Sequence, residues 1–138
     1  MKNQFIWPVR IYYEDTDAVG VVYYTNYLKF MERARTEWLR ALGFEQDILR
    51  HETGIIFVVR SVTVDYLRPA RFNDLLEVVS CVEELHRVSL IFSQNIRYSQ
   101  ANDQILCMGK VKVACLDATT LRPRPLPVTL ITEIRSVD

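Results

Sequence analysis

The sequence predicts an α+β domain in which one long helix packs on one face of a curved antiparallel sheet of about five strands. Apolar residues recur at three- and four-residue spacing over residues 26–42, which is the period of an amphipathic helix. Four stretches rich in β-branched residues follow, joined by short turns, and this favours antiparallel pairing. The chain of 138 residues has no repeat or Gly/Ser linker, so we expect one domain over residues 1–138.

A first strand is predicted over residues 4–13, followed by a loop over residues 14–25. Pro8 indicates that this strand lies at a sheet edge or contains a bulge, because proline donates no hydrogen bond to a neighbouring strand. Later strands are predicted at 56–68, 74–86, 88–99 and 104–117, ending at turn residues such as Pro69, Asn73–Asp74 and Asn102–Asp103. The proline-rich segment after them is extended. Residues 128–135 fit a short helix and an edge strand equally well.

The predicted helix carries a wide apolar stripe along residues 26–42. Thr25 or Asn26 can cap its start, and Gly43 suits the position just past its end. The stripe consists of Tyr27, Met31, Ala34, Trp38 and Leu42, widened by Leu28, Phe30 and Leu39. Such a stripe has to be covered, and a single sheet covers it. That sheet exposes an edge, so we expect pairing with a second copy of the chain.

Composition restricts the class of protein. Lys and Arg number 17, as do Asp and Glu, so formal net charge is zero and no bulk field attracts nucleic acid or an anionic membrane. No apolar run is long enough for a signal peptide or a membrane span, so we expect a soluble cytoplasmic protein without membrane insertion. Cys81, Cys107 and Cys115 lack metal-ligand spacing, and His51 lies far from His86. We therefore expect no metal and no bound cofactor.

The stretch YYEDTDAVGVVYYTNYLKF, residues 12–30, places three acids just before the helix. One interpretation is a turn, in which Asp15 or Asp17 accepts backbone hydrogen bonds and Gly20 supplies a positive φ. The other is a catalytic site, because the neighbouring residues are too apolar for a solvated loop and a helix start offers free N–H groups. Such N–H groups stabilise an oxyanion while a carboxylate attacks a carbonyl or activates water. A carboxylate is a weak base, so a reactive thioester suits it better than an amide.

The run D-x-D-x-x-G-V-V-Y-Y-x-N-Y, continuing through F-M-E-R-A-R-T-E-W-L, resembles the hotdog-fold acyl-CoA thioesterases. The match is to the 4-hydroxybenzoyl-CoA thioesterase type, and in particular to bacterial thioesterases associated with the Tol–Pal system. Further similar segments are F-V-V-R at 57–60, V-D-Y-L-R-P-A-R at 64–71 and P-R-P-L-P at 123–127. The resemblance implies a hotdog fold, an acyl-CoA substrate and a homodimer or homotetramer with active sites at the dimer interface.

The resemblance also implies roles for particular residues. Asp17 is the catalytic carboxylate and acts either as nucleophile or as general base. The backbone N–H of Tyr24 binds the thioester carbonyl. The expected substrate-binding residues are Tyr13, Gly20, Tyr23, Val58, Val59, Arg60, Arg87 and Ser89, of which the arginines and the serine would hold coenzyme A. Many members of the Tol–Pal group have histidine where this chain has Tyr24, so no imidazole acts there and the acyl preference stays open.

Two other functions compete with the thioesterase. One is a non-catalytic scaffold that binds an acyl group or acyl carrier protein for the cell-envelope or phospholipid-synthesis machinery. The other is a hotdog hydratase, for which neither histidine stands in a suitable motif. We expect Asp15 to have a structural role in the turn and Glu32 to be solvated or paired with Arg33 or Arg35.

Overall fold

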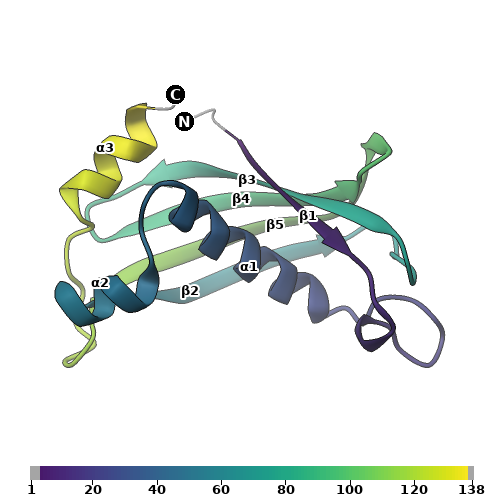
Figure 1. Ribbon diagram of the computed structural model, residues 1–138, viewed down its shortest axis with the longest axis horizontal. Coiled ribbons are helices and arrows are strands. Elements are labelled where there is room, and N and C mark those ends of the chain that lie inside the picture. The colour runs from purple at the N-terminus through teal and green to yellow at the C-terminus, as the bar shows by residue number, and fades with distance from the viewer. Residues whose placement is uncertain (1–3, 137–138) are drawn as a thin grey trace.

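The computed structural model describes residues 4–136, without the side chain of Asn102. Within that range the chain forms five strands, three α-helices and one 3-10 turn (Figure 1). The elements are β1 (Phe5–Arg10), η1 (Tyr13–Asp15), α1 (Asn26–Ala41), α2 (Gln46–Glu52), β2 (Ile55–Tyr66), β3 (Leu75–Leu85), β4 (Ser89–Tyr98), β5 (Ala101–Asp117) and α3 (Val128–Ser136). All strands pair antiparallel in the order β1-β3-β4-β5-β2. The predicted α+β class with one long helix and five strands is confirmed.

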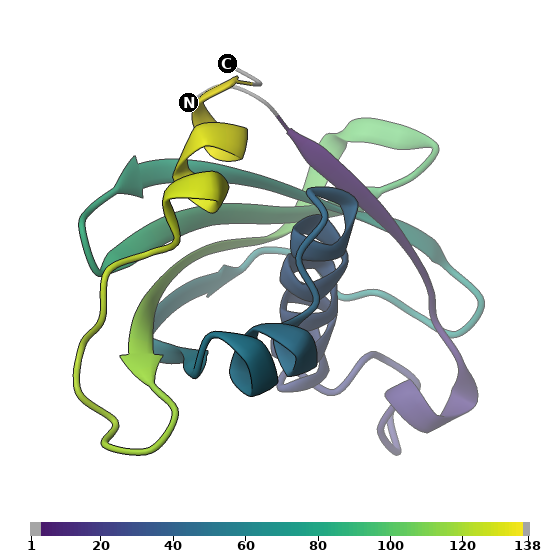
Figure 2. The same cartoon turned by 60° about the vertical axis from the view of Figure 1, so that its left-hand side comes forward.

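The sheet curves around α1, which lies across its concave face (Figures 1 and 2). The buried residues of α1 follow the predicted stripe, with Tyr27, Met31, Ala34 and Trp38 each at most 4% exposed. Two apolar clusters form the core. One lies against the first half of α1, and the other lies against its second half together with α3. Because α1 fills the curve of the sheet, its two ends face different surroundings.

The two edges of the sheet differ in length. β1 pairs only with β3, and Pro8 lies opposite Glu77, so the predicted edge position of Pro8 is confirmed. β2 forms the other edge, pairing along its 12 residues with β5 alone. This second edge is long and carries exposed Val59 and Val62, which is the kind of edge that another chain can extend.

Three local predictions were incomplete or wrong. Helix α2 was not predicted, because its seven residues bury no side chain completely and so carry no strong apolar period. The open choice at residues 128–135 is resolved as a helix, since Leu130 and Ile134 are both buried and cover one end of the core. The turn before β5 lies at residues 99–100, not at 102–103, because Tyr98 pairs with Ala101 and extends the ladder.

None of the helices found between residues 4 and 136 is long and apolar enough to cross a membrane. Over the same residues, no group of three or more His, Cys, Asp or Glu side chains is arranged to hold a metal ion.

Candidate active site

Asp15 organises the loop that leads into α1. Its carboxylate Oδ2 accepts the backbone N–H of Tyr12 at 2.9 Å and closes the short turn η1. Its backbone carbonyl accepts the N–H of Tyr23 at 3.0 Å and the side-chain amide of Asn26 at 2.9 Å. The predicted structural role of Asp15 is therefore confirmed, and it holds the start of the helix against the loop.

Asp17 lies two residues further on, in a tight hairpin over residues 16–22. Its N–H donates to Val21 O at 2.9 Å, its carbonyl accepts Gly20 N–H at 3.0 Å, and Gly20 has φ +92°. The carboxylate Oδ1 accepts Val19 N–H at 2.9 Å. Among the described residues no donor bonds Oδ2, and the residue is exposed. The turn predicted for this stretch is present, and it leaves one carboxylate oxygen available.

The start of α1 has no side-chain cap, contrary to the capping role predicted for Thr25 or Asn26. Thr25 occupies the cap position without accepting a hydrogen bond, and Asn26 turns its amide to Asp15 instead. Across residues 4–136 no oxygen accepts the backbone N–H of Tyr24 or Thr25. Unpaired N–H groups at a helix start carry partial positive charge and can bind an oxygen that becomes negative.

The hairpin and the helix start are held against the β2–β3 connection. Val22 N–H donates to Ala70 O at 2.8 Å, and Ala70 N–H donates to the hydroxyl of Tyr27 at 3.0 Å. Burial raises the pKa of Tyr27 above its ordinary 10.0, so this hydroxyl stays protonated at neutral pH. The loop is thus fixed at several points, which suits a site that has to hold a carboxylate and N–H donors in place.

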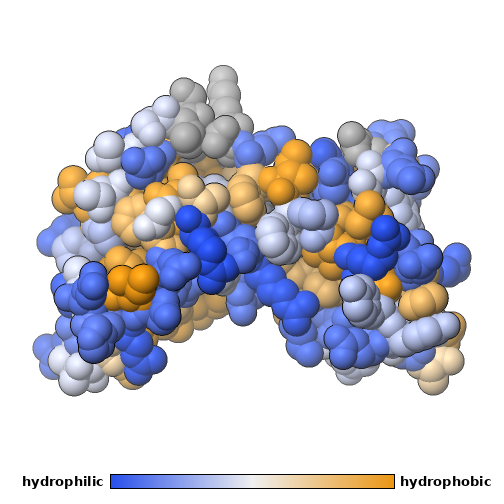
Figure 3. All heavy atoms as spheres, viewed as in Figure 1, coloured by the Kyte–Doolittle hydropathy of each residue, from blue (hydrophilic) through white to orange (hydrophobic). Residues whose placement is uncertain are grey.

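Aromatic rings surround the helix start. The ring of Tyr24 lies 6.1 Å from that of Tyr66 and 4.9 Å from that of Tyr23, measured between centroids. An open cavity of about 260 Å³, the helix-start cavity, is lined by Val22, Tyr24, Tyr27, Tyr66, Leu67, Arg68 and Pro69. Tyr13 lies outside this cavity, stacked on Phe72 with ring centroids 3.8 Å apart. Apolar side chains are exposed around this loop, at the lower right of Figure 3.

The predicted residues of β2 separate onto opposite faces of the sheet. Val59 is in register with Val113, and Val113 with Leu90, so all three side chains face α1. Val58 is in register with Ala114 and hence with Ser89, on the other face. The two neighbouring valines therefore contact different surroundings, and they do not line one common cavity.

Arg60 and Ser89 meet at an open groove on the outer face of the sheet. Arg60 is the extra residue of a bulge between Val59 and Ser61, which turns its side chain relative to the regular alternation. The groove measures about 370 Å³ and is also lined by Lys112, which sequence reasoning missed. The only sequence signal for Lys112 was the alternation of apolar and polar residues along β5, which places Lys112 on the outer face of the sheet. Its position beside the bulge, paired with Ser61, depends on the strand register.

Two further arginines have separate positions. Arg87 is exposed at the turn between β3 and β4, where its carbonyl accepts Leu126 N–H at 2.9 Å. Arg124 Nη1 donates to the carbonyls of Thr53 and Gly54 and lies 3.3 Å from Asp117 Oδ2. Arg124 therefore connects the end of α2 to the end of β5 and has a structural role.

Comparison with known proteins identifies the family. The profile described as the Thioesterase-like superfamily matches residues 12–134. The chain belongs to this superfamily. Over 131 residues it is 45% identical to the acyl-CoA thioester hydrolase YbgC of Escherichia coli O6:H1, covering 95% of this chain and 96% of that one. The prediction that this chain is a thioesterase, and therefore a thioester hydrolase, is confirmed.

Solved structures agree with this membership of the Thioesterase-like superfamily. A probable thioesterase from Bartonella henselae superposes with a TM-score of 0.83 at 32% identity, covering 91% of this chain and 100% of that chain. A 4-hydroxybenzoyl-CoA thioesterase mutant complexed with 4-hydroxybenzoyl-CoA superposes with a TM-score of 0.87 at 20% identity, covering 95% and 98%. The second likeness shows the shared hotdog fold.

Proposed function

We propose that this chain hydrolyses acyl-CoA thioesters to a free acid and CoA, with the carboxylate of Asp17 as the nucleophile or the general base. The observation that carries the proposal is the placement of Asp17 Oδ2 and the Tyr24 N–H, both without a partner in residues 4–136, on one hydrogen-bonded loop. The similarity to YbgC, named as an acyl-CoA thioester hydrolase, supports the choice of substrate.

The chemistry follows from these two groups. The Tyr24 N–H, at the positive end of α1, donates to the thioester carbonyl oxygen and stabilises the charge that grows on it, which is worth about 2.7–4 kcal/mol per donor in comparable sites. Asp17 either attacks the carbonyl carbon, so that an anhydride forms and CoA leaves as a thiolate, or removes a proton from an attacking water. In both routes one water is consumed, and one acid and one CoA thiol are released.

The groove of Arg60, Ser89 and Lys112 is the proposed place for the phosphates of CoA. Two cations and a hydroxyl lie together on a chain whose net charge is zero, so the positive charge here is local. Arg87 at the adjacent β3–β4 turn is a further candidate. Coenzyme A enters this proposal as part of the substrate, and no other cofactor is needed.

A second copy of the chain completes the proposed site. The catalytic loop lies at the start of α1, whereas Arg60 lies at the bulge of the edge strand β2. Pairing of two β2 edges would join the sheets of two chains and cover exposed Val59, Val62 and Tyr66. We therefore propose a homodimer, or a tetramer built from it, in which each active site draws on both chains.

The test measures thiol release from short, long and aromatic acyl-CoAs and from acyl carrier protein thioesters. Asp17→Asn keeps the Oδ1 acceptor for Val19 N–H, so the variant should fold normally while kcat falls by about 10²–10⁴-fold. Glu14→Gln is the matched control, because Glu14 is an exposed acid in the same loop. Near-normal kcat in Asp17→Asn would reject the assignment. Slow release by wild type from every thioester would favour the non-catalytic scaffold.

A further inference from the structure

Asn26 attaches one end of the catalytic hairpin, residues 16–22, to the first turn of α1. Its Nδ2 donates to Asp15 O at 2.9 Å, and the same carbonyl oxygen accepts Tyr23 N–H at 3.0 Å. Asparagine near a helix start is favoured because its side-chain oxygen can accept a helix N–H, whereas here the amide donates to a residue eleven positions earlier. Asn26 is only 8% exposed, so this contact is shielded from water.

Tyr27 attaches the other end of the hairpin through the β2–β3 connection. Its hydroxyl accepts Ala70 N–H at 3.0 Å, and Ala70 O accepts Val22 N–H at 2.8 Å. Tyr27 and Ala70 are both buried, so water has little access to replace the hydroxyl. A buried N–H without a partner costs free energy. Loss of this hydroxyl should therefore displace Ala70, and the end of the hairpin with it.

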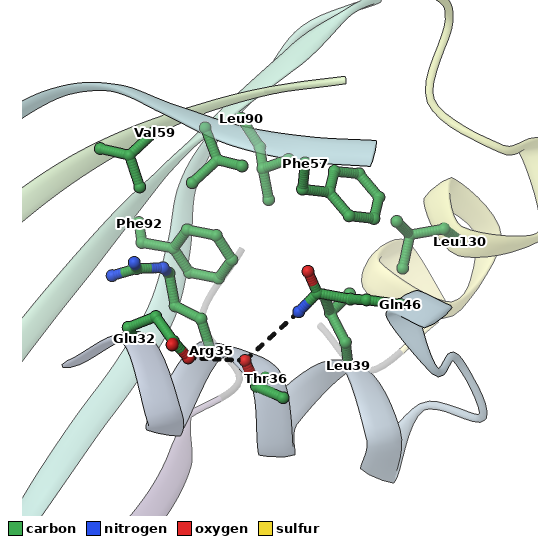
Figure 4. Close-up of a pocket in the computed structure, with 11 residues that line it drawn as sticks. Glu32, Arg35, Thr36, Leu39, Gln46, Phe57, Val59, Leu90, Phe92 and Leu130 are labelled. Carbon is green, nitrogen blue, oxygen red and sulfur yellow. Dashed lines mark hydrogen bonds between the residues drawn. The ribbon is translucent and has the colours of Figure 1, made fainter. Parts of the chain in front are cut away.

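The helix that holds the hairpin is itself fixed to the sheet. Gln94 is fully buried, and its Nε2 donates to Met31 O and to Ser80 Oγ, each at 2.9 Å. Its Oε1 accepts Arg35 Nη1 at 2.8 Å, and Figure 4 shows Arg35 extending from α1 toward Phe92. The first turn of α1 is thus part of a rigid element, which places attached side chains more precisely than a loop does.

The polar side chains in the second half of α1 bond to one another and to the sheet. Glu32, expected to be solvated or paired with Arg33 or Arg35, is exposed and accepts the Thr36 hydroxyl at 2.8 Å (Figure 4). Burial lowers the pKa of Arg35 below its ordinary 12.5, and the nearby negative charge of Glu32 opposes this effect. Within residues 4–136, none of these side chains forms a hydrogen bond with the catalytic hairpin.

We propose that Asn26 and Tyr27 are positioning residues, which hold the Asp17 carboxylate in place relative to the Tyr24 N–H. This inference rests on the proposed hydrolysis. The thioester oxygen bonds to the N–H while Asp17, or the water that it activates, approaches the carbonyl carbon. Both contacts form together only if the hairpin and the helix start keep one fixed geometry, and a displacement of about 1 Å can cost roughly 10²-fold in rate.

Two variants remove the attachments with little change of shape. Asn26→Leu keeps a similar volume without the amide, and Tyr27→Phe keeps the ring without the hydroxyl. Each should lower kcat about tenfold per folded molecule and leave KM unchanged, as expected when only the transition state is affected. Tyr98→Phe is the matched control. The Tyr98 hydroxyl donates to Pro69 O at 2.9 Å, beside Ala70, but does not connect to the helix, so kcat should stay normal.

Two further measurements separate positioning from a damaged fold. In the Asp17→Asn background each variant should lower kcat by less than about twofold, because the carboxylate that it misplaces no longer reacts. Hydrogen exchange should become at least about tenfold faster at the amides of Val22 and Tyr23, which open locally. It should not change at Cys115 N–H, which donates to Val88 O at the other end of the sheet.

Several results would overturn the positioning role. They are unchanged exchange at Val22 and Tyr23 in both variants, an equal loss of kcat in Tyr98→Phe, and an undiminished loss in the Asp17→Asn background. An active wild type with normal kcat in both variants would reject the positioning role alone. A wild type that releases thiol from no thioester would reject the proposed hydrolysis, and the positioning role with it.

Discussion

Gly109 of β5 lies directly beneath Met31 of α1, and a β-carbon on Gly109 would stand 2.9 Å from Met31 Cε and 3.1 Å from its Sδ. The absence of a side chain at this one position of the sheet lets the helix approach closely. Met31 is completely buried, so its side chain has little space into which it could move. This contact sets the distance between helix and sheet beside the Gln94–Arg35 pair.

Gly109→Ala should destabilise the fold by about 1–3 kcal/mol, the usual cost of overpacking a filled core. In an ordinary strand position the same change is stabilising, because alanine restricts the unfolded chain more than glycine does. The free energy of unfolding is measured by urea denaturation. Combined with Met31→Leu, which lacks the Cε atom, the loss should be less than the sum of the two single effects. A stabilised Gly109→Ala protein would contradict the close contact.

Arg60→Ala and Lys112→Ala should each raise KM for acyl-CoA roughly 3–10-fold at low salt and leave kcat unchanged, because each removes about 1 kcal/mol of phosphate attraction. The effect should shrink as salt screens the charges. Lys110→Ala is the matched control, since Lys110 lies two residues away on the same strand and pairs with Glu83 at 3.0 Å. A similar KM effect in the control would remove the groove from the proposal.

Asp117 makes part of the stability depend on pH. Backbone hydrogen bonds from Thr120 and Thr119, both 2.9 Å, and the nearby Arg124 lower the pKa of this carboxyl below its ordinary 3.8. A carboxyl group whose pKa is lower in the folded state stabilises the fold at pH values above its pKa in the unfolded state. This stabilisation is lost as the pH falls through its pKa in the folded state. Asp117→Asn should therefore have a lower Tm than wild type at neutral pH. The difference should shrink below about pH 3.8, and a constant difference at every pH would refute this explanation.

The three cysteines should react at different rates. Burial raises the pKa of Cys107 to about 12 and also raises that of Cys115, and both side chains are buried, whereas Cys81 is half-buried. Only a thiolate attacks a disulfide reagent. In the native protein near pH 8, no more than one thiol should therefore react quickly with Ellman's reagent, and all three should react after unfolding. Cys81→Ser should remove the fast reaction, and persistence of a fast phase in that variant would show that a buried thiol is accessible.

Local patterns were most informative along residues 12–43. The apolar period over 26–42 predicted α1 to within one residue of its end, and Gly20 and Gly43 both have the positive φ that their positions indicated. The capping prediction failed there because Asn26 forms its hydrogen bond with Asp15, eleven residues earlier, and sequence spacing gives no sign of that contact.

The sequence by itself determined the helix, the number of strands and the acidic turn before α1, because these depend on the spacing of neighbouring residues. Only the tertiary structure decided that Val58 and Val59 face apart, that Arg60 meets Lys112, and that Arg35 meets Gln94, 59 residues away. Such contacts depend on strand register, on one bulge and on how closely α1 approaches Gly109. None of these leaves a periodic signal, since each arises from packing between segments that are distant along the chain.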